Sequence, residues 1–222
     1  MSPWNSEEVT RQDVFDHFAH VIKATAHGRR LELLEILAQG EHTVDTLSQL
    51  SGLAVTTASN NLQTLKRAGL VSTRREGTSI FYRLAGADVL ELFLAAKRVA
   101  LRRYPALANA LQTYMGAPRS HGPTIDPAEI TADMYILDVR PQAEYKSGHF
   151  PAAVCIPMAE LEERHEEVPR DRQVVVYCRG ELCRLAREAA ALLRDRGVDA
   201  RAMDEGVTEW RAAKDFPLDH AS

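Results

Sequence analysis

The sequence predicts two domains, a mainly α N-terminal domain and an α/β C-terminal domain with a central parallel sheet. Apolar residues recur at helical spacing through most of residues 12–115, whereas short apolar strands alternate with helices after residue 131. A segment with two Gly and three Pro and little apolar periodicity, residues 115–130, separates these patterns. We therefore expect domains at residues 1–116 and 131–222, joined by a linker at residues 117–130.

The composition is typical of a globular protein without a membrane-spanning segment. The 222 residues are 45% hydrophobic, which is enough for two modest cores. No stretch approaches the roughly 20 apolar residues of a transmembrane helix, and the N-terminus lacks the pattern of a signal peptide. We therefore expect a cytoplasmic protein without a membrane partner. Its cysteines are too few for a disulfide scaffold, which favours reactive or sensing thiols.

The charge differs between the two halves of the chain. Residues 1–120 carry 14 Lys and Arg against 11 Asp and Glu, a net charge of +3, whereas residues 121–222 carry 13 against 20, a net charge of −7. A mildly basic N-terminal half is compatible with a nucleic-acid partner but does not predict one by itself. The argument for DNA therefore depends on the motifs.

The N-terminal half contains two short helices that meet at a glycine turn. Two longer helices, with a break near Gly28, come first. A helix from Thr43 to Gly52 is followed by one within residues 54–70, which Thr56 or Thr57 would cap and Gly69 would close. This is a helix-turn-helix arrangement. The second helix carries side chains that can read base edges in a major groove: Thr56, Thr57, Ser59, Asn60, Asn61 and Gln63.

A β-hairpin and a long helix follow. Leu70–Arg74 and Ser79–Leu84 are expected to pair, with Gly77 in the turn. Basic residues at the hairpin tip and at the end of the preceding helix are candidate phosphate contacts: Lys66, Arg67, Arg74 and Arg75. Residues 88–115 are expected to form one helix, richer in Leu and Ala than a monomer requires, which predicts a homodimer.

The order of these elements, from Val14 to about Met115, resembles the winged helix-turn-helix of ArsR-type repressors. The most specific segment is TTASNNLQTLKRAGLVSTRREGTSIFYRL. The resemblance implies a homodimer that binds an imperfect inverted repeat in double-stranded operator DNA. The Cys, His and Asp sites of metal-sensing members are absent, and His17, His20 and His27 would form only a weak site. We therefore expect no metal and no cofactor.

The C-terminal half places a thiol where parallel sheets carry their chemistry. The expected strands are residues 134–139, 152–158, 173–178 and 199–204. Cys178 ends the third strand, and chemistry in such sheets lies at the carboxyl ends of strands. A helix that begins near Arg184 directs its N-terminal amides at this thiol, and Arg179 adds positive charge, so we expect Cys178 to be unusually nucleophilic. Cys155 falls within a buried strand, where packing is its default role.

Residues 134–217 resemble a rhodanese domain in the segments ILDVRPQAEYKSGHFPAAVCIPMAEL and VVVYCRGELCRLAREAAALLRDRGVDARAMDEGVTEWRAAKDFPL. The family's active loop corresponds here to Cys178, Arg179, Gly180, Glu181, Leu182 and Cys183, followed by Arg184. The resemblance implies that Cys178 accepts a sulfane sulfur as a persulfide and passes it to a thiol. Asp138 and Arg140 match the DVR element, whose implied role is mainly structural, and Gly148 with His149 match the GH turn.

The second thiol of the loop shapes the functional hypothesis. Cys183 stands where many sulfurtransferases of the family carry Arg, which weakens the expectation of a preference for thiosulfate. We favour a transcriptional repressor whose rhodanese domain senses or transfers sulfane sulfur from polysulfide, persulfide or thiosulfate through Cys178. Cys183 would be the resolving thiol.

Two other hypotheses remain open. The chain could be primarily an enzyme, a sulfurtransferase, that the winged helix recruits to DNA. The C-x5-R spacing from Cys178 to Arg184 also fits the phosphate loop of cysteine phosphatases and some arsenate reductases, although Leu185 replaces the expected hydroxyl residue. The C-terminal half could instead be an inert docking module, but its intact nucleophile argues against this.

Overall fold

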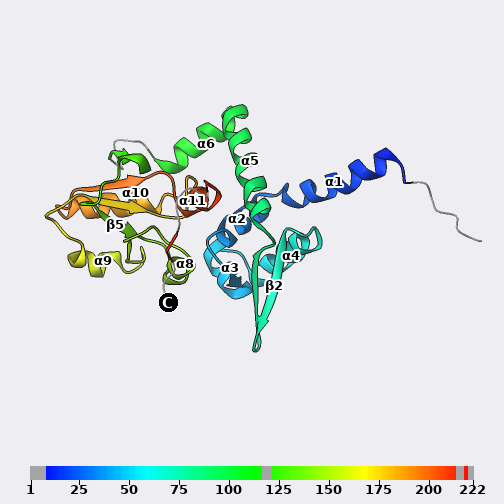
Figure 1. Cartoon of the computed structure of the whole chain (residues 1–222), viewed down its shortest axis with the longest axis horizontal. Helices are drawn as coiled ribbons and strands as arrows, with labels where there is room; N and C mark the ends of the chain where they lie inside the picture. Colours follow the sequence, from blue (N-terminus) through cyan, green and yellow to red (C-terminus); the bar gives the residue numbers. More distant parts are fainter. Residues whose placement is uncertain (1–8, 117–121, 214–217, 220–222) are drawn as a thin grey trace, which may run out of the picture.

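The computed structural model describes residues 9–116, 122–213 and 218–219, and the predicted fold class is confirmed. Two halves lie side by side, with α1 extending away from the rest of the chain (Figure 1). The elements of the N-terminal half are α1 (Arg11–Thr25), α2 (Gly28–Leu37), β1 (His42–Thr43), α3 (Val44–Ser51), α4 (Val55–Arg67), β2 (Val71–Glu76), β3 (Ser79–Leu84), α5 (Ala87–Arg103) and α6 (Pro105–Met115).

Helices α3 and α4 form the predicted helix-turn-helix. The Thr43 side chain caps α3, which ends at Gly52 in the left-handed region with φ +64°. Gly69, at φ +75°, follows the end of α4, as expected. The predicted cap of α4 is wrong: Ala54 is the N-cap and makes no side-chain hydrogen bond. The turn between the helices is so short that Thr56 and Thr57 already lie inside the first turn of α4.

The predicted hairpin forms a wing of three strands. β2 and β3 pair from Val71–Leu84 to Glu76–Ser79. β3 has the expected bounds, whereas β2 starts at Val71 and runs on to Glu76 instead of Arg74, so the turn is tighter than expected. Gly77 adopts φ +58° in this turn, a conformation that favours glycine. β1 pairs with β3 and was not predicted, because two residues are too few to show an alternating pattern.

The expected single helix over residues 88–115 is wrong, because it breaks at Tyr104. Pro105 cannot donate a backbone hydrogen bond, and it disfavours a helical conformation at the residue before it. Tyr104 accordingly adopts φ −121° and ψ 90°, and α6 starts with the proline. The break turns α6 toward the C-terminal half, whereas α5 crosses between the two halves (Figure 1).

The C-terminal half is a five-stranded parallel sheet in the order β4-β8-β7-β5-β6. Its elements are β4 (Thr124–Ile125), η1 (Pro127–Glu129), β5 (Tyr135–Asp138), α8 (Gln142–Lys146), β6 (Val154–Cys155), α9 (Leu161–Arg164), η2 (His165–Glu167), β7 (Val174–Tyr177), α10 (Leu185–Asp195), β8 (Ala200–Met203) and α11 (Val207–Ala213). Part of the segment expected as a linker, residues 117–130, thus contributes an edge strand; residues 117–121 lie outside the described residues.

The central strand β7 is buried on both faces. Its side chains alternate, so Val174 and Val176 pack in the cluster that includes α10, whereas Val175 and Tyr177 pack with Phe150 on the other face. This two-sided burial is why the strand reads as a continuous apolar run. It also fixes the position of Cys178, the next residue. Within the described ranges, no helix is long and apolar enough to cross a membrane.

A pair of glycine substitutions tests the helix-turn-helix geometry. Gly52→Ala should lower the free energy of unfolding by about 1–2 kcal/mol, because alanine is strained at a positive φ even where space is available. Gly28→Ala, at the first position of α2 and also without a close neighbour, should be neutral or stabilising by up to about 1 kcal/mol. Urea unfolding of both variants measures the difference, and equal effects would contradict this account.

Candidate functional site

The exposed face of α4 carries most of the side chains expected to read DNA. Ala58, Leu62 and Leu65 are buried against the N-terminal core, which turns the opposite face of the helix to solvent. On that face Thr56, Thr57, Asn60, Gln63, Lys66 and Arg67 are exposed, and Ser59 and Asn61 are partly exposed. Their side chains are therefore accessible to a DNA groove.

Some of these polar side chains are already engaged. The amide of Asn61 donates to the carbonyl of Thr57 at 2.9 Å, and that of Gln63 donates to the hydroxyl of Tyr82 at 3.3 Å. Lys66 donates to Thr73 on the wing at 2.9 Å. These bonds fix the position of α4 relative to β2 and β3.

The wing arginines differ from each other. Nε of Arg74 donates to Glu41 at 2.7 Å, and its Nη1 donates to Glu76 at 2.5 Å. The hydrogen bond from Arg74 lowers the pKa of Glu41, so the carboxylate stays charged. Arg74 was expected on a phosphate, but this pairing neutralises it. Arg75 is exposed at the tip and donates to the carbonyl of Gly77 at 3.0 Å, and it forms no ion pair with a described Asp or Glu.

The two loop thiols lie at the end of β7 and the start of α10. Cys178 is 1% exposed, and its Sγ–H donates to the carbonyl of Cys183 at 3.2 Å. Backbone N–H groups of Ala186 and Gly180 act to lower the pKa of Cys178, and those of Leu185 and Arg179 act to lower the pKa of Cys183. The loop thus directs amide donors at both sulfurs, as an anion-binding loop does.

The two thiols ionise differently. Burial raises the pKa of Cys178, and its hydrogen bond with Cys183 raises it further. The interaction with the Cys178 side chain lowers the pKa of Cys183 to about 7, against the effect of burial. Cys183 is therefore the more readily ionised thiol of the pair, whereas the sequence predicts the more reactive thiolate at Cys178. The reason is that Cys178 ends a fully buried strand.

The remaining cysteine and the loop arginine have structural contacts. Burial raises the pKa of Cys155 to about 12, and its Sγ lies 3.7 Å from the carbonyl of Arg140. Arg184 pairs with Glu188 at 2.7 Å and lies over the ring of Tyr114, with its side chain 49% exposed. A half-exposed, ion-paired arginine is poorly placed to hold a phosphate within the loop.

Buried ion pairs anchor the loop. Asp138 and Arg140 are both fully buried and bond at 2.6 Å, and Tyr177 donates to Asp138 at 2.6 Å. Arg140 also donates to the carbonyl of Gly148 at 2.8 Å, which ties together the DVR and GH elements. Arg179 pairs with the buried Glu144 at 2.6 Å. The residue after Cys178 is therefore held by a charge-assisted bond.

The thiol loop lies against the N-terminal half, which the sequence did not predict. Gln39, just after α2 and fully buried, donates to Thr208 at 2.7 Å and accepts from Arg140 at 3.0 Å. Thr208 in turn donates to the carbonyl of Arg179 at 2.7 Å. Leu182 of the loop packs against the N-terminal core. The sequence holds one signal for this contact: the amide side chain of Gln39 directly follows the apolar residues of α2.

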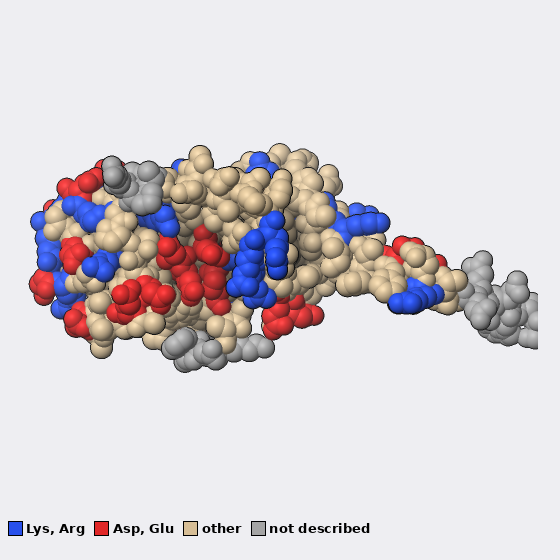
Figure 2. Space-filling view, turned by 90° about the horizontal axis from the view of Figure 1, so that it is seen from above, with Lys and Arg blue, Asp and Glu red and all other residues tan. Residues whose placement is uncertain are grey.

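Charged groups complete the junction. Lys97 of α5 pairs with Glu181 of the loop at 2.8 Å and with Glu209 of α11 at 2.6 Å. Acidic side chains of the C-terminal half gather beside basic ones at this junction (Figure 2). Burial and, to a lesser extent, the charge of Cys183 raise the pKa of Glu35 on α2 to about 7. The α2 helix thus places a titratable carboxyl near the thiol pair.

The histidines that could form a weak metal site do not come together with other ligands. His17 and His20 are on α1, and Nδ1 of His27 accepts from the N–H of Arg29 at 3.2 Å as the cap of α2. Among the residues with described positions, no group of three or more His, Cys, Asp or Glu is arranged to hold a metal ion.

Comparisons with known proteins agree with this two-part organisation. The family model "Bacterial regulatory protein, arsR family" matches residues 27–73, and the model "Rhodanese-like domain" matches residues 125–213. The HTH-type transcriptional regulator Rv0324 of Mycobacterium tuberculosis is 42% identical over 214 residues, which is 94% of this chain and 93% of that protein.

Other similar proteins match only the N-terminal half. The biofilm growth-associated repressor of Xylella fastidiosa is 37% identical over 87 residues, 38% of this chain and 76% of that protein. The solved homodimeric winged helix-turn-helix DNA-binding domain of a possible ArsR-family regulator from Mycobacterium bovis is 44% identical, with a TM-score of 0.41, and the match covers 47% of this chain and 94% of that one. The chain therefore belongs to the arsR family of bacterial transcriptional regulators and carries a rhodanese-like domain as its second half.

Proposed function

We propose that this regulator is a homodimeric repressor that responds to sulfane sulfur through a persulfide on Cys178, with Cys183 as the resolving thiol. The observation that carries the proposal is the contact of the thiol loop with the DNA-binding half. Loop residue Glu181 pairs with Lys97, and Leu182 packs in the N-terminal core. A chemical change in the loop therefore acts directly on groups that hold α2 and α5.

The burial of the thiols favours sensing over enzymatic turnover. A sulfurtransferase must present its persulfide to an acceptor, but Cys178 is 1% exposed and its loop is covered by α2 and α5. Such a site suits a small inorganic polysulfide better than a bulky thiol acceptor. The half-exposed Arg184 likewise gives no support to the cysteine phosphatase or arsenate reductase alternative.

The proposed chemistry uses the interaction between the two thiol side chains. Cys178 passes its proton to the Cys183 thiolate, and the Cys178 thiolate, which the backbone N–H groups of Ala186 and Gly180 stabilise, attacks an S–S bond of a polysulfide. A persulfide forms, and a polysulfide one sulfur shorter leaves with the bonding electron pair. After Cys183 loses its proton again, its thiolate attacks the inner sulfur of the Cys178 persulfide. HS⁻ leaves, and a Cys178–Cys183 disulfide remains.

A longer adduct gives a related product. If several sulfur atoms remain on Cys178, the Cys183 thiolate can attack the second of them and release the outer part as a shorter polysulfide. This leaves a sulfur-bridged link, which spans the loop with less distortion than a direct disulfide. Either link changes the loop that contacts α2 and α5.

The apolar face of α1 supports a homodimer. Val14, Phe15, Phe18 and Ile22 recur at helical spacing on this helix and are 39–63% exposed. A contiguous row of large apolar side chains in water is typical of an interaction surface. We propose that a second copy of the chain covers this face, so that two copies of α4 read an imperfect inverted repeat in cytoplasmic DNA. The repressor relative of Xylella fastidiosa supports the direction of regulation.

Serine substitutions of the two thiols test the sensing chemistry. Polysulfide should lower the affinity of the wild type for its operator by about 5- to 150-fold, the usual range of coupling between two sites, and dithiothreitol should reverse this. Cys178→Ser and Cys183→Ser should bind DNA like the reduced wild type and stay unresponsive, because a hydroxyl is a poor nucleophile at neutral pH. Operator titrations with paired mass spectra measure both effects. A response in both variants would exclude this thiol pair as the switch.

The wing arginines should affect DNA binding unequally. Arg75→Ala should reduce the slope of log affinity against log salt by about one per lost phosphate contact, hence by about two for a dimer. Arg74→Ala should change the slope less, because Glu41 and Glu76 already neutralise Arg74. Arg172→Ala, on the C-terminal half, serves as the control. If Arg74→Ala reduced the slope more than Arg75→Ala, Arg74 would not be paired with Glu41 and Glu76 in the DNA complex.

Loss of the junction ion pairs should uncouple chemistry from DNA binding. Lys97→Met removes the partner of Glu181 and Glu209, so the loop can change without moving α5. The variant should form the persulfide and bind the operator when reduced, but polysulfide should change its affinity less than twofold, a coupling below about 0.4 kcal/mol. Lys146→Met, exposed on α8, should respond like the wild type. A full response of Lys97→Met would show that coupling takes another route.

A further inference from the structure

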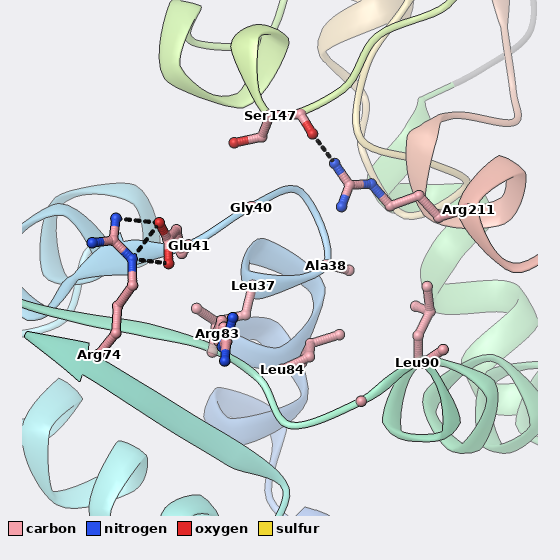
Figure 3. Close-up of a pocket in the computed structure, with 12 residues that line it drawn as sticks. Leu37, Ala38, Gly40, Glu41, Arg74, Arg83, Leu84, Leu90, Ser147 and Arg211 are labelled. Atoms are coloured by element: carbon pink, nitrogen blue, oxygen red, sulfur yellow. Dashed lines mark hydrogen bonds and ion pairs between the residues drawn. The ribbon is translucent and has the colours of Figure 1, made fainter. Parts of the chain in front are cut away.

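A separate cavity of about 550 Å³ lies where the two halves meet. Figure 3 shows its opposite sides: Ser147 and Arg211 come from the C-terminal half, whereas Arg74 and Arg83 come from the wing. None of the residues that line it belongs to the thiol loop. Its volume is within the range of pockets that hold small molecules, which often lie at domain boundaries.

Two arginines leave positive charge at this cavity without a compensating carboxylate. Arg211 donates from Nη2 to the carbonyls of Gln39 at 3.1 Å and Ser147 at 2.7 Å, and its buried Nε has no hydrogen-bond partner. Arg83 donates to the hydroxyl of Ser72 at 3.2 Å. Within the described part of the chain, neither guanidinium has an Asp or Glu oxygen within 4.0 Å. A partly buried charge without a partner favours a bound counter-ion.

The other charged groups at the cavity do not cancel this excess. Arg74 and Glu41 pair with each other, so together they contribute no net charge. Burial lowers the pKa of Arg211, and the nearby charge of Arg140 lowers it further, which is consistent with the lack of a carboxylate beside it among the described residues. The cavity therefore has a net charge of about +2 from Arg83 and Arg211.

The remaining wall is apolar and adjoins the start of a long helix. Leu37, Leu84 and Leu90 contribute aliphatic surface. Gly86, the N-cap of α5, also lines the cavity. The Asp88 carboxylate in the first turn of that helix already accepts from the N–H of Val89 at 3.1 Å, so the start of the helix offers no free positive end to a bound anion.

From this combination we infer that the cavity binds a small organic oxyanion, a carboxylate with an aliphatic or aromatic body. The oxyanion lies between Arg83 and Arg211, and the body covers Leu37, Leu84 and Leu90. Guanidinium groups bind carboxylate oxygens in charge-assisted, often bidentate hydrogen bonds, while the leucines favour a carbon skeleton over an inorganic ion. The ligand contacts both halves, so it is a second effector that acts without thiol chemistry.

Calorimetric titration of the reduced, full-length protein tests this site with three probes: hexanoate, benzoate and inorganic phosphate. We expect saturable binding of at least one carboxylate. Arg83→Gln and Arg211→Gln should each weaken it by about tenfold or more, the loss expected for one charge-assisted bond. Arg172→Gln, exposed on the C-terminal half, should bind like the wild type.

The outcomes that overturn the inference are distinct. No saturable binding of either carboxylate, or binding that neither arginine variant changes, would show that the cavity is not an oxyanion site. Phosphate binding as tight as that of hexanoate and benzoate would overturn the role of the leucine wall. Arg211→Gln removes two hydrogen bonds at the junction, so this variant could lose binding through unfolding. Arg83 is exposed, so Arg83→Gln tests the oxyanion site without that effect. Because Cys178→Ser should bind the carboxylate unchanged, failure of the thiol switch would leave this result intact.

Discussion

The buried ion pair of Asp138 and Arg140 is the interaction on which the functional part of the molecule depends. Two fully buried charges are costly unless each has partners, and here every partner belongs to a different element. Arg140 holds the carbonyl of Gly148 and the side chain of Gln39, and Asp138 accepts from Tyr177, the residue before Cys178. One buried pair thus links the end of β5, the thiol strand and the DNA-binding half.

The position of the thiol loop follows from this constraint. Gln39 reaches the loop through Thr208 and Arg179, and Lys97 reaches it through Glu181. The loop is therefore an interface as well as a candidate reactive site, and any negative charge on the two cysteines lies in that interface. A change in this charge alters the balance of a region where Lys97, Glu209 and Glu35 already interact in a poorly solvated space.

Ion pairs also distinguish the arginines of the molecule from one another. Arg74 is held by acidic partners in the wing, while Arg75 at the tip bonds the carbonyl of Gly77. Arg83 and Arg211 have no such acidic partner among the described residues, and they line a cavity between the halves. Arginines that are close in sequence or in space therefore differ in their contacts, because some have a carboxylate beside them and others do not.

The sequence by itself determined most of the elements and the place of Cys178. Gly52 and Gly69 marked helix ends, the hairpin and the parallel strands followed from local periodicity, and Cys178 was placed at the end of a strand. Pro105 also indicates the helix break, but the continuous apolar periodicity around it favoured a single helix. Only the tertiary structure decided that Gln39 enters the C-terminal half, that Glu41 neutralises Arg74 and that the pKa of Cys183 is lowered while that of Cys178 is raised. Local patterns record which residues are buried, whereas pairing and ionisation depend on groups that can lie more than 100 residues apart, as Gln39 and Arg140 do.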